Sequence, residues 1–108
     1  MVETAQEADA SGLPYMMVGH VGDGNFHMLY LVDPAIPAER ELAESLNHRQ
    51  AQRAIRAGGT CTGEHGIGLH KMDLLQEEAG EEAIDLMRTL KQALDPRNIL
   101  NPGKIFTL

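Results

Sequence analysis

One short stretch constrains the fold of this chain more than any other. The run from Gly19 to His27 contains two histidines, three glycines and an Asp-Gly step, and apolar residues flank it on both sides. Two apolar runs joined by Asp-Gly are typical of a β-hairpin, because the turn needs residues that tolerate a positive φ. The sequence therefore predicts an antiparallel hairpin over about residues 15–32.

The register of this hairpin decides where its histidines lie. If Asp23 and Gly24 are the two central residues of the turn, His20 lies directly opposite His27. Directly opposed residues project to the same face of a sheet, with Cβ atoms roughly 4.5–5.5 Å apart. Two imidazoles placed in this way can share one metal ion. The alternative at this point is a hairpin whose histidines have no functional role.

A second glycine cluster lies between Gly58 and Gly68 and contains Glu64 and His65. Eight of the eleven glycines of the chain lie at positions 19–24 or 58–68. Such clustering favours backbone in unusual conformations or close to a ligand. Two histidines and a carboxylate are a common open ligand set for Zn²⁺, Mn²⁺ or Fe²⁺, so His20, His27 and Glu64 are candidate metal ligands.

Length and composition limit the class of protein. A chain of 108 residues is one small domain at most. The formal net charge of −7 argues against nucleic acid and against an anionic membrane surface as partners. Cys61 is the only cysteine, which excludes an intrachain disulfide and favours a reducing compartment. We find no signal peptide and no membrane span, and we expect a cytoplasmic protein.

The remaining segments predict helices around the hairpin. Residues 1–11 resemble the last turns of a helix, residues 37–57 a helix, and residues 69–79 a short helix or a structured loop. Residues 60–62 are β-prone and predict a further short strand. The clearest helix spans residues 81–94, with one apolar face formed by Ala83, Leu86, Met87, Leu90 and Leu94. The prediction is an α+β fold, with an antiparallel sheet built on the hairpin, one or two further short strands, and helices packed on one face.

Three further features have a simpler interpretation. His48 and His70 are best interpreted as surface residues, and Cys61 as a small buried residue rather than a nucleophile. The tail from Asp95 to Phe106 contains apolar residues that should pack on something. It is either an extension docked on the core or a segment shaped to meet a cofactor, and both interpretations stay open.

Three motifs together resemble a known family. They are His20 to His27, Gly63 to Gly68, and Leu94 to Phe106 with its Asn-Pro-Gly-Lys run. In this order they resemble the C-terminal domain of FAD-linked oxidases, in the branch of D-lactate, glycolate and D-2-hydroxyglutarate dehydrogenases within the vanillyl-alcohol-oxidase-type flavoproteins. The resemblance covers residues from about Gly12 to Phe106, which is nearly the whole chain.

The resemblance implies a reaction and a role for each matching residue. Members of the family oxidise a D-2-hydroxy acid to a 2-keto acid and pass a hydride to FAD. His20, His27 and Glu64 match the positions that hold a divalent metal, and His65 matches the presumed general base. Asn25, Asn101 and Lys104 match positions on the cofactor side of the site. The fold implied is part of a ferredoxin-like cap domain.

The chain also departs from the family. It contains no glycine-rich dinucleotide fingerprint between a strand and a helix, so we expect residues 1–108 to be a single-domain C-terminal fragment without the FAD-binding domain, and inactive alone. Two alternatives are a non-catalytic self-associating module and a metal-dependent hydrolase. Because a fragment exposes surfaces that a larger protein covers, we also expect a homodimer.

Overall fold

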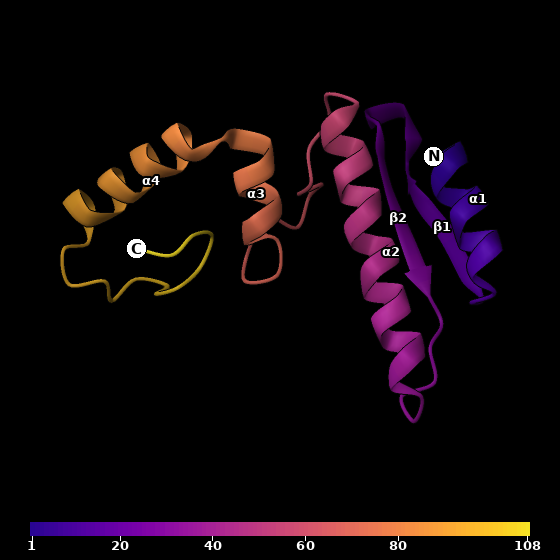
Figure 1. Ribbon diagram of the computed structural model, residues 1–108. Coiled ribbons are helices and arrows are strands. Elements are labelled where there is room, and N and C mark those ends of the chain that lie inside the picture. The colour runs from indigo at the N-terminus through magenta and orange to yellow at the C-terminus, as the bar shows by residue number, and fades with distance from the viewer. The chain divides into compact units, whose positions relative to one another are not determined.

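The computed structural model describes residues 1–108 and confirms an α+β fold. Its elements in order are α1 (Val2–Ser11), β1 (Tyr15–His20), the 3₁₀ turn η1 (Val21–Asp23), β2 (Asn25–Tyr30), α2 (Pro37–Arg56), α3 (Met72–Ala79) and α4 (Glu81–Leu94). Figure 1 labels the four helices and the two strands. The chain divides into two compact units, Met1–Arg53 and Ala54–Leu108, and each is described by itself. None of the helices combines the length and the apolar character that crossing a membrane requires.

The first unit packs two helices on one face of the β1–β2 hairpin. Tyr15 lies directly opposite Tyr30, so the two rings project to the same face. The Tyr15 hydroxyl donates a hydrogen bond of 2.8 Å to Asp9 of α1. Tyr30 packs against a buried cluster to which α2 contributes Ala43 and Leu46. Helices α1 and α2 therefore cover the tyrosine face, and the other face of the hairpin stays open within this unit. The prediction placed the helices at 37–57 and 81–94 on one face; the first of them lies there, whereas residues 81–94 belong to the second unit.

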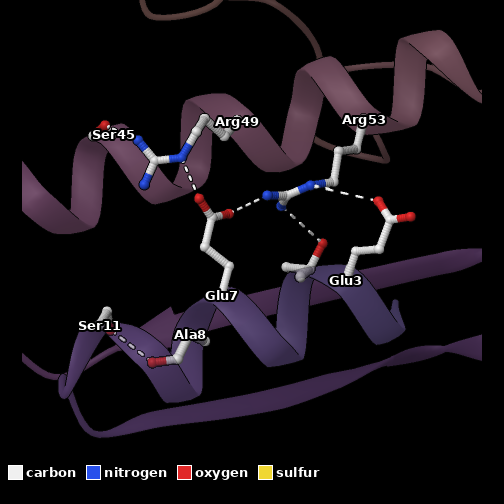
Figure 2. Close-up of polar contacts among 8 residues, drawn as sticks. Glu3, Glu7, Ala8, Ser11, Ser45, Arg49 and Arg53 are labelled. Carbon is white, nitrogen blue, oxygen red and sulfur yellow. Dashed lines mark hydrogen bonds and ion pairs between the residues drawn. The ribbon is translucent and has the colours of Figure 1, made fainter.

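Ion pairs join α1 to α2 (Figure 2). The Glu7 carboxylate accepts hydrogen bonds from both Arg49 and Arg53, and Arg53 also lies 3.8 Å from a carboxylate oxygen of Glu3. Burial by itself raises the pKa of Glu7, but the two guanidinium groups outweigh it and hold that pKa below its ordinary value. The ionised form of Glu7 is therefore the form that the fold stabilises.

This arrangement predicts acid sensitivity of the first unit. A carboxyl group whose pKa is lowered by folding stabilises the fold above its ordinary pKa of 4.5, and this contribution is lost as the pH falls through the lowered value. We expect Glu7→Gln to lower the urea midpoint at pH 7. Between pH 5 and pH 3 the midpoint of this variant should decrease less than that of the wild type. Tyrosine fluorescence reports on this unit, because Tyr15 and Tyr30 are the two tyrosines of the chain.

The exposed Glu41 of α2 offers a matched control. Glu41→Gln removes the same charge from the same pair of helices, and we expect it to leave the pH dependence of the wild type in place. An equal change in both variants would contradict the role of Glu7.

The second unit buries a different face of α4 from the predicted one. The bounds of α4 agree with the prediction, and its buried residue is Ile84, which is 2% exposed. Leu86, Leu90 and Leu94 of the predicted apolar face are 60%, 53% and 82% exposed. This apolar face is therefore not the side of α4 that is buried within this unit, because α3 and the tail pack against the side that carries Ile84 and Arg88.

The predicted additional strand at residues 60–62 does not form, and the sheet has two strands. Side chains satisfy the backbone of Cys61 instead. Glu78 accepts a hydrogen bond of 2.9 Å from the Cys61 N–H, and Lys71 donates one of 2.6 Å to the Cys61 carbonyl. Because these two groups are satisfied within the second unit, Cys61 needs no neighbouring strand.

Candidate functional site

The turn of the hairpin is longer than predicted. Strand β1 ends at His20 and β2 begins at Asn25, so four residues, 21–24, form the loop. The N–H of Gly24 donates a hydrogen bond of 3.0 Å to the carbonyl of Val21, and Gly24 has a φ of 70°. The prediction that Asp23 and Gly24 alone form the turn was therefore wrong.

The longer turn changes the pairing of the histidines but not their face. His20 lies opposite Asn25, and His27 lies opposite Val18, so the prediction of direct opposition was wrong. The register is shifted by two residues, and only an odd shift moves side chains to the other face. His20 and His27 are therefore diagonal neighbours on one face, a relation that places such residues roughly 7–8 Å apart, with somewhat less between the Cβ atoms.

Gly19 allows the two strands to approach closely beside His20. A Cβ atom added to Gly19 would lie 2.4 Å from the carbonyl oxygen of Asn25 and 2.5 Å from the Cα atom of Phe26. Both atoms belong to the backbone of β2, so no side-chain rotation would relieve the contact. The glycine is thus required by the close approach of the strands that present the histidines.

The face that carries the histidines is open and largely apolar. Met16, Val18 and Leu29 lie on it and are 58%, 43% and 49% exposed. His20 is exposed, and Asn25 and His27 are half-buried. The predicted ligands His20 and His27 and the predicted cofactor residue Asn25 therefore form one polar group at the turn end of an exposed apolar surface.

The second unit carries two further predicted site residues, Glu64 and His65, next to each other. The Nε2 atom of His65 lies 3.6 Å from the Oε1 atom of Glu64, and both side chains are exposed. The N–H of His65 donates a hydrogen bond of 3.2 Å to the Thr62 carbonyl. Three glycines with positive φ shape this loop: Gly63, Gly66 and Gly68, at 52°, 74° and 56°.

Cys61 lies before this loop and is 4% exposed. Burial is the main cause that raises the pKa of its thiol to about 11. A thiol with this pKa is not ionised near neutral pH, and the thiolate is the reactive form. The structure thus agrees with the prediction that Cys61 is a small buried residue and not a nucleophile.

The tail contains three residues other than glycine with positive φ. They are Asn98, Asn101 and Ile105, at 50°, 46° and 73°. The predicted cofactor residues Asn101 and Lys104 are exposed. Ile99, Leu100 and Ile105 are 63%, 64% and 43% exposed, so the prediction that the apolar tail residues pack on something is not met for these three in the second unit.

The tail is held by residues that no sequence pattern indicates. Asp95 is 6% exposed, and its carboxylate accepts hydrogen bonds from the side chain of Lys91 and from the N–H groups of Ile99 and Leu100. The pKa of Asp95 is lowered to about 2, mainly by Lys91 and then by these amides.

The profile of a family described as FAD linked oxidases, C-terminal domain, matches residues 1–105. The chain belongs to this family. It is 49% identical over 108 residues to a probable mitochondrial D-lactate dehydrogenase of Danio rerio, and this match covers 100% of this chain and 22% of the relative. It is 50% identical over 105 residues to the mitochondrial D-lactate dehydrogenase [cytochrome] of Kluyveromyces lactis, over 97% of this chain and 18% of the relative.

A third relative is the glycolate oxidase subunit GlcD of Bacillus subtilis, which is 48% identical over 88 residues, covering 82% of this chain and 19% of the relative. The chain thus spans about a fifth of the length of these curated relatives. Two of them are named as mitochondrial proteins, and the cytoplasmic location expected from the sequence stays a prediction.

Proposed function

We propose that this chain forms the metal- and substrate-binding portion of a FAD-dependent dehydrogenase that oxidises a 2-hydroxy acid, of the D-lactate or glycolate type. The observation that carries the proposal is the family match over residues 1–105, together with relatives named D-lactate dehydrogenase and glycolate oxidase subunit. Because the chain spans about a fifth of those relatives, the whole reaction is assigned to an enzyme of their length that contains it. Residues 1–108 alone are expected to be inactive.

The hairpin supports a metal role for the two histidines. His20 and His27 present imidazoles from diagonal positions on one exposed face, where both can approach one ion. Imidazole nitrogen and carboxylate oxygen are ligands of Zn²⁺, Mn²⁺ and Fe²⁺ alike, so the donor types leave the metal open. Glu64 of the second unit is the proposed third ligand.

The remaining residues would bind the reactants and move a proton. When bound, a divalent ion supplies Lewis-acid polarisation of the substrate hydroxyl, and FAD supplies the acceptor for the hydride. His65 would take the proton of that hydroxyl as a neutral imidazole, with the neighbouring Glu64 carboxylate stabilising the cation that results. Asn25, Asn101 and Lys104 would contact the cofactor and orient it.

An absorbance spectrum tests the proposal on the natural protein isolated from its own organism, whatever its full length. We expect flavin bands, and we expect D-lactate or glycolate to bleach them in the absence of an electron acceptor. L-lactate serves as the control, because it presents the same groups with the opposite configuration. A protein without flavin, or flavin bands that no 2-hydroxy acid bleaches, would overturn the proposal.

Self-association is a second candidate property, favoured by the open apolar surfaces. The hairpin exposes Met16, Val18 and Leu29 on one side, and the tail exposes Ile99 and Leu100. Exposed apolar patches of this kind mark interfaces, and two-fold pairing is the commonest arrangement of identical chains. We propose a homodimer of residues 1–108, with the hairpin or the tail at the contact.

Sedimentation equilibrium at micromolar concentration measures this directly. We expect about twice the monomer mass of 11.8 kDa for the wild type and a shift toward monomer for Val18→Lys, which places a charge on the open hairpin face. Glu41→Gln on the exposed side of α2 is the control, and it should leave the mass unchanged. A single species at 11.8 kDa for the wild type would contradict the homodimer.

A further inference from the structure

The buried carboxylate of Asp95 joins the last turn of α4 to the start of the tail. It lies directly after α4, where its Oδ1 atom accepts a hydrogen bond of 3.1 Å from Ile99 and its Oδ2 atom one of 2.9 Å from Leu100. The Lys91 ammonium on the last turn of α4 donates to the same carboxylate and also to the Leu100 carbonyl. Residues 95–100 are thus closed into a compact loop on the end of the helix.

The tail then continues to a second attachment point. The N–H of Ile105 donates a hydrogen bond of 2.8 Å to the carbonyl of Gly68, and the N–H of Phe106 donates one of 2.9 Å to the carbonyl of Lys104. The latter bond spans three residues centred on Ile105, whose φ is 73°. A γ-turn with positive φ is rare and strained, and more so at a β-branched residue, so the surrounding contacts must hold it.

Gly68 closes the loop that carries the site residues. Glu64 and His65 lie three to four positions before it, between glycines with positive φ. The tail and this loop therefore share a direct backbone contact, and the buried carboxylate fixes the near end of the tail. Arg88 of α4 fixes its far end through a hydrogen bond of 2.7 Å to the Thr107 carbonyl.

We propose that Asp95 is a positioning residue that, through the tail and the Ile105–Gly68 contact, sets the conformation of the loop carrying Glu64 and His65. Its place in catalysis rests on the proposed function, since only that function gives Glu64 and His65 their roles. The coupling itself needs neither flavin nor metal. A strained tail held at Asp95 and Arg88 would keep the loop in one conformation, which a site that positions a base requires.

Amide hydrogen exchange of the full chain tests this coupling. In Asp95→Ala we expect the N–H groups of Leu100 and Ile105 to exchange roughly tenfold to a hundredfold faster, the range for losing hydrogen bonds to a charged acceptor. The decisive reporter is the N–H of His65. It donates its hydrogen bond to the Thr62 carbonyl, so this bond involves neither Asp95 nor the tail. We expect it to exchange about fivefold faster or more, while the amides in the middle of α4 keep their protection.

Two further variants make the result decisive. Glu82→Gln removes an exposed carboxylate from the first turn of α4 and should leave all three reporters unchanged. Ile105→Pro leaves Asp95 intact and removes the attachment of the tail to Gly68, because proline has no N–H to donate and its φ near −65° cannot form the positive-φ turn at this position. It should accelerate His65 as Asp95→Ala does, and it decides the matter if Asp95→Ala fails to fold. Faster exchange in the tail with an unchanged His65 amide would overturn the proposal and leave the proposed function untouched.

Discussion

Replacing Gly19 by alanine is expected to destabilise the first unit by about 3 kcal/mol. The new Cβ atom would lie 2.4 Å from the Asn25 carbonyl oxygen and 2.5 Å from the Phe26 Cα atom, both in the backbone of β2. Relief requires the strands to separate where Gly19 lies opposite Phe26, next to the pair of His20 and Asn25. Urea unfolding followed by tyrosine fluorescence measures the loss, because both tyrosines lie in the hairpin.

The neighbouring Gly22 provides a matched control within the turn. A Cβ atom added to Gly22 would meet no atom within 4 Å, and its φ is not in the left-handed region. We expect Gly22→Ala to change the free energy of unfolding by no more than about 0.5 kcal/mol. Equal effects of the two substitutions would show that the close approach of the strands at Gly19 does not matter.

The largest effect on metal binding is expected from substitution of either histidine of the hairpin. We expect His20→Ala and His27→Ala each to weaken Zn²⁺ binding by about 100-fold or more, or about 2.7 kcal/mol. Loss of a residue that only supports a metal-binding side chain lowers the metal affinity by up to about 100-fold. Loss of the metal-binding side chain itself should lower the affinity by at least as much. Isothermal titration calorimetry with Zn²⁺ measures the affinities.

The double variant shows whether the two histidines share one ion. If they do, the second substitution costs far less than the first, because the ion has already lost its site. His70→Ala, at an exposed histidine of the second unit, is the control and should bind as the wild type does. Additive losses, or an equal loss in the control, would mean that the two imidazoles bind separate ions or none.

Much of the fold could be predicted from the sequence. Apolar periodicity and flanking Pro and Gly residues gave α2 and α4 within one residue of their ends, and the hairpin within two. The prediction of the turn was wrong because Asp-Gly favours a two-residue turn. In the structure, Val21, Gly22 and Asp23 form a 3₁₀ turn that ends at Gly24. The predicted turn has two residues and the observed loop has four. Because both numbers are even, the prediction that His20 and His27 share one face is correct in spite of the wrong turn.

Periodicity could not identify the buried side of α4. The helix carries an apolar stripe at Leu86, Leu90 and Leu94 and, on another side, Ile84 followed by the cations Arg88 and Lys91. The tail binds that second side through hydrogen bonds from Arg88 and Lys91 to tail carbonyls. No periodic pattern encodes such contacts, because they join side chains to backbone atoms of a segment without regular structure.

Part of the candidate site could likewise be predicted from the sequence, and part could not. The residue types and spacing predicted the pair His20 and His27 on one face, and placed Glu64 beside His65 in one glycine-rich loop. Asp95 was missed because a single Asp-Pro step after a helix is a common end signal. Its burial and its hydrogen bonds to Ile99 and Leu100 depend on the path of the tail, which the sequence alone did not define.

The most direct test of the central claim is whether metal-loaded residues 1–108 recognise a 2-hydroxy acid through its hydroxyl group. Calorimetric titration of D-lactate into the Zn²⁺-loaded chain should show binding, which disappears when the metal is removed by a chelator and is much weaker for propionate, which lacks the hydroxyl. His27→Ala should lose the binding, and His70→Ala should retain it. Equal binding of D-lactate and propionate, or binding of D-lactate without metal, would contradict the account.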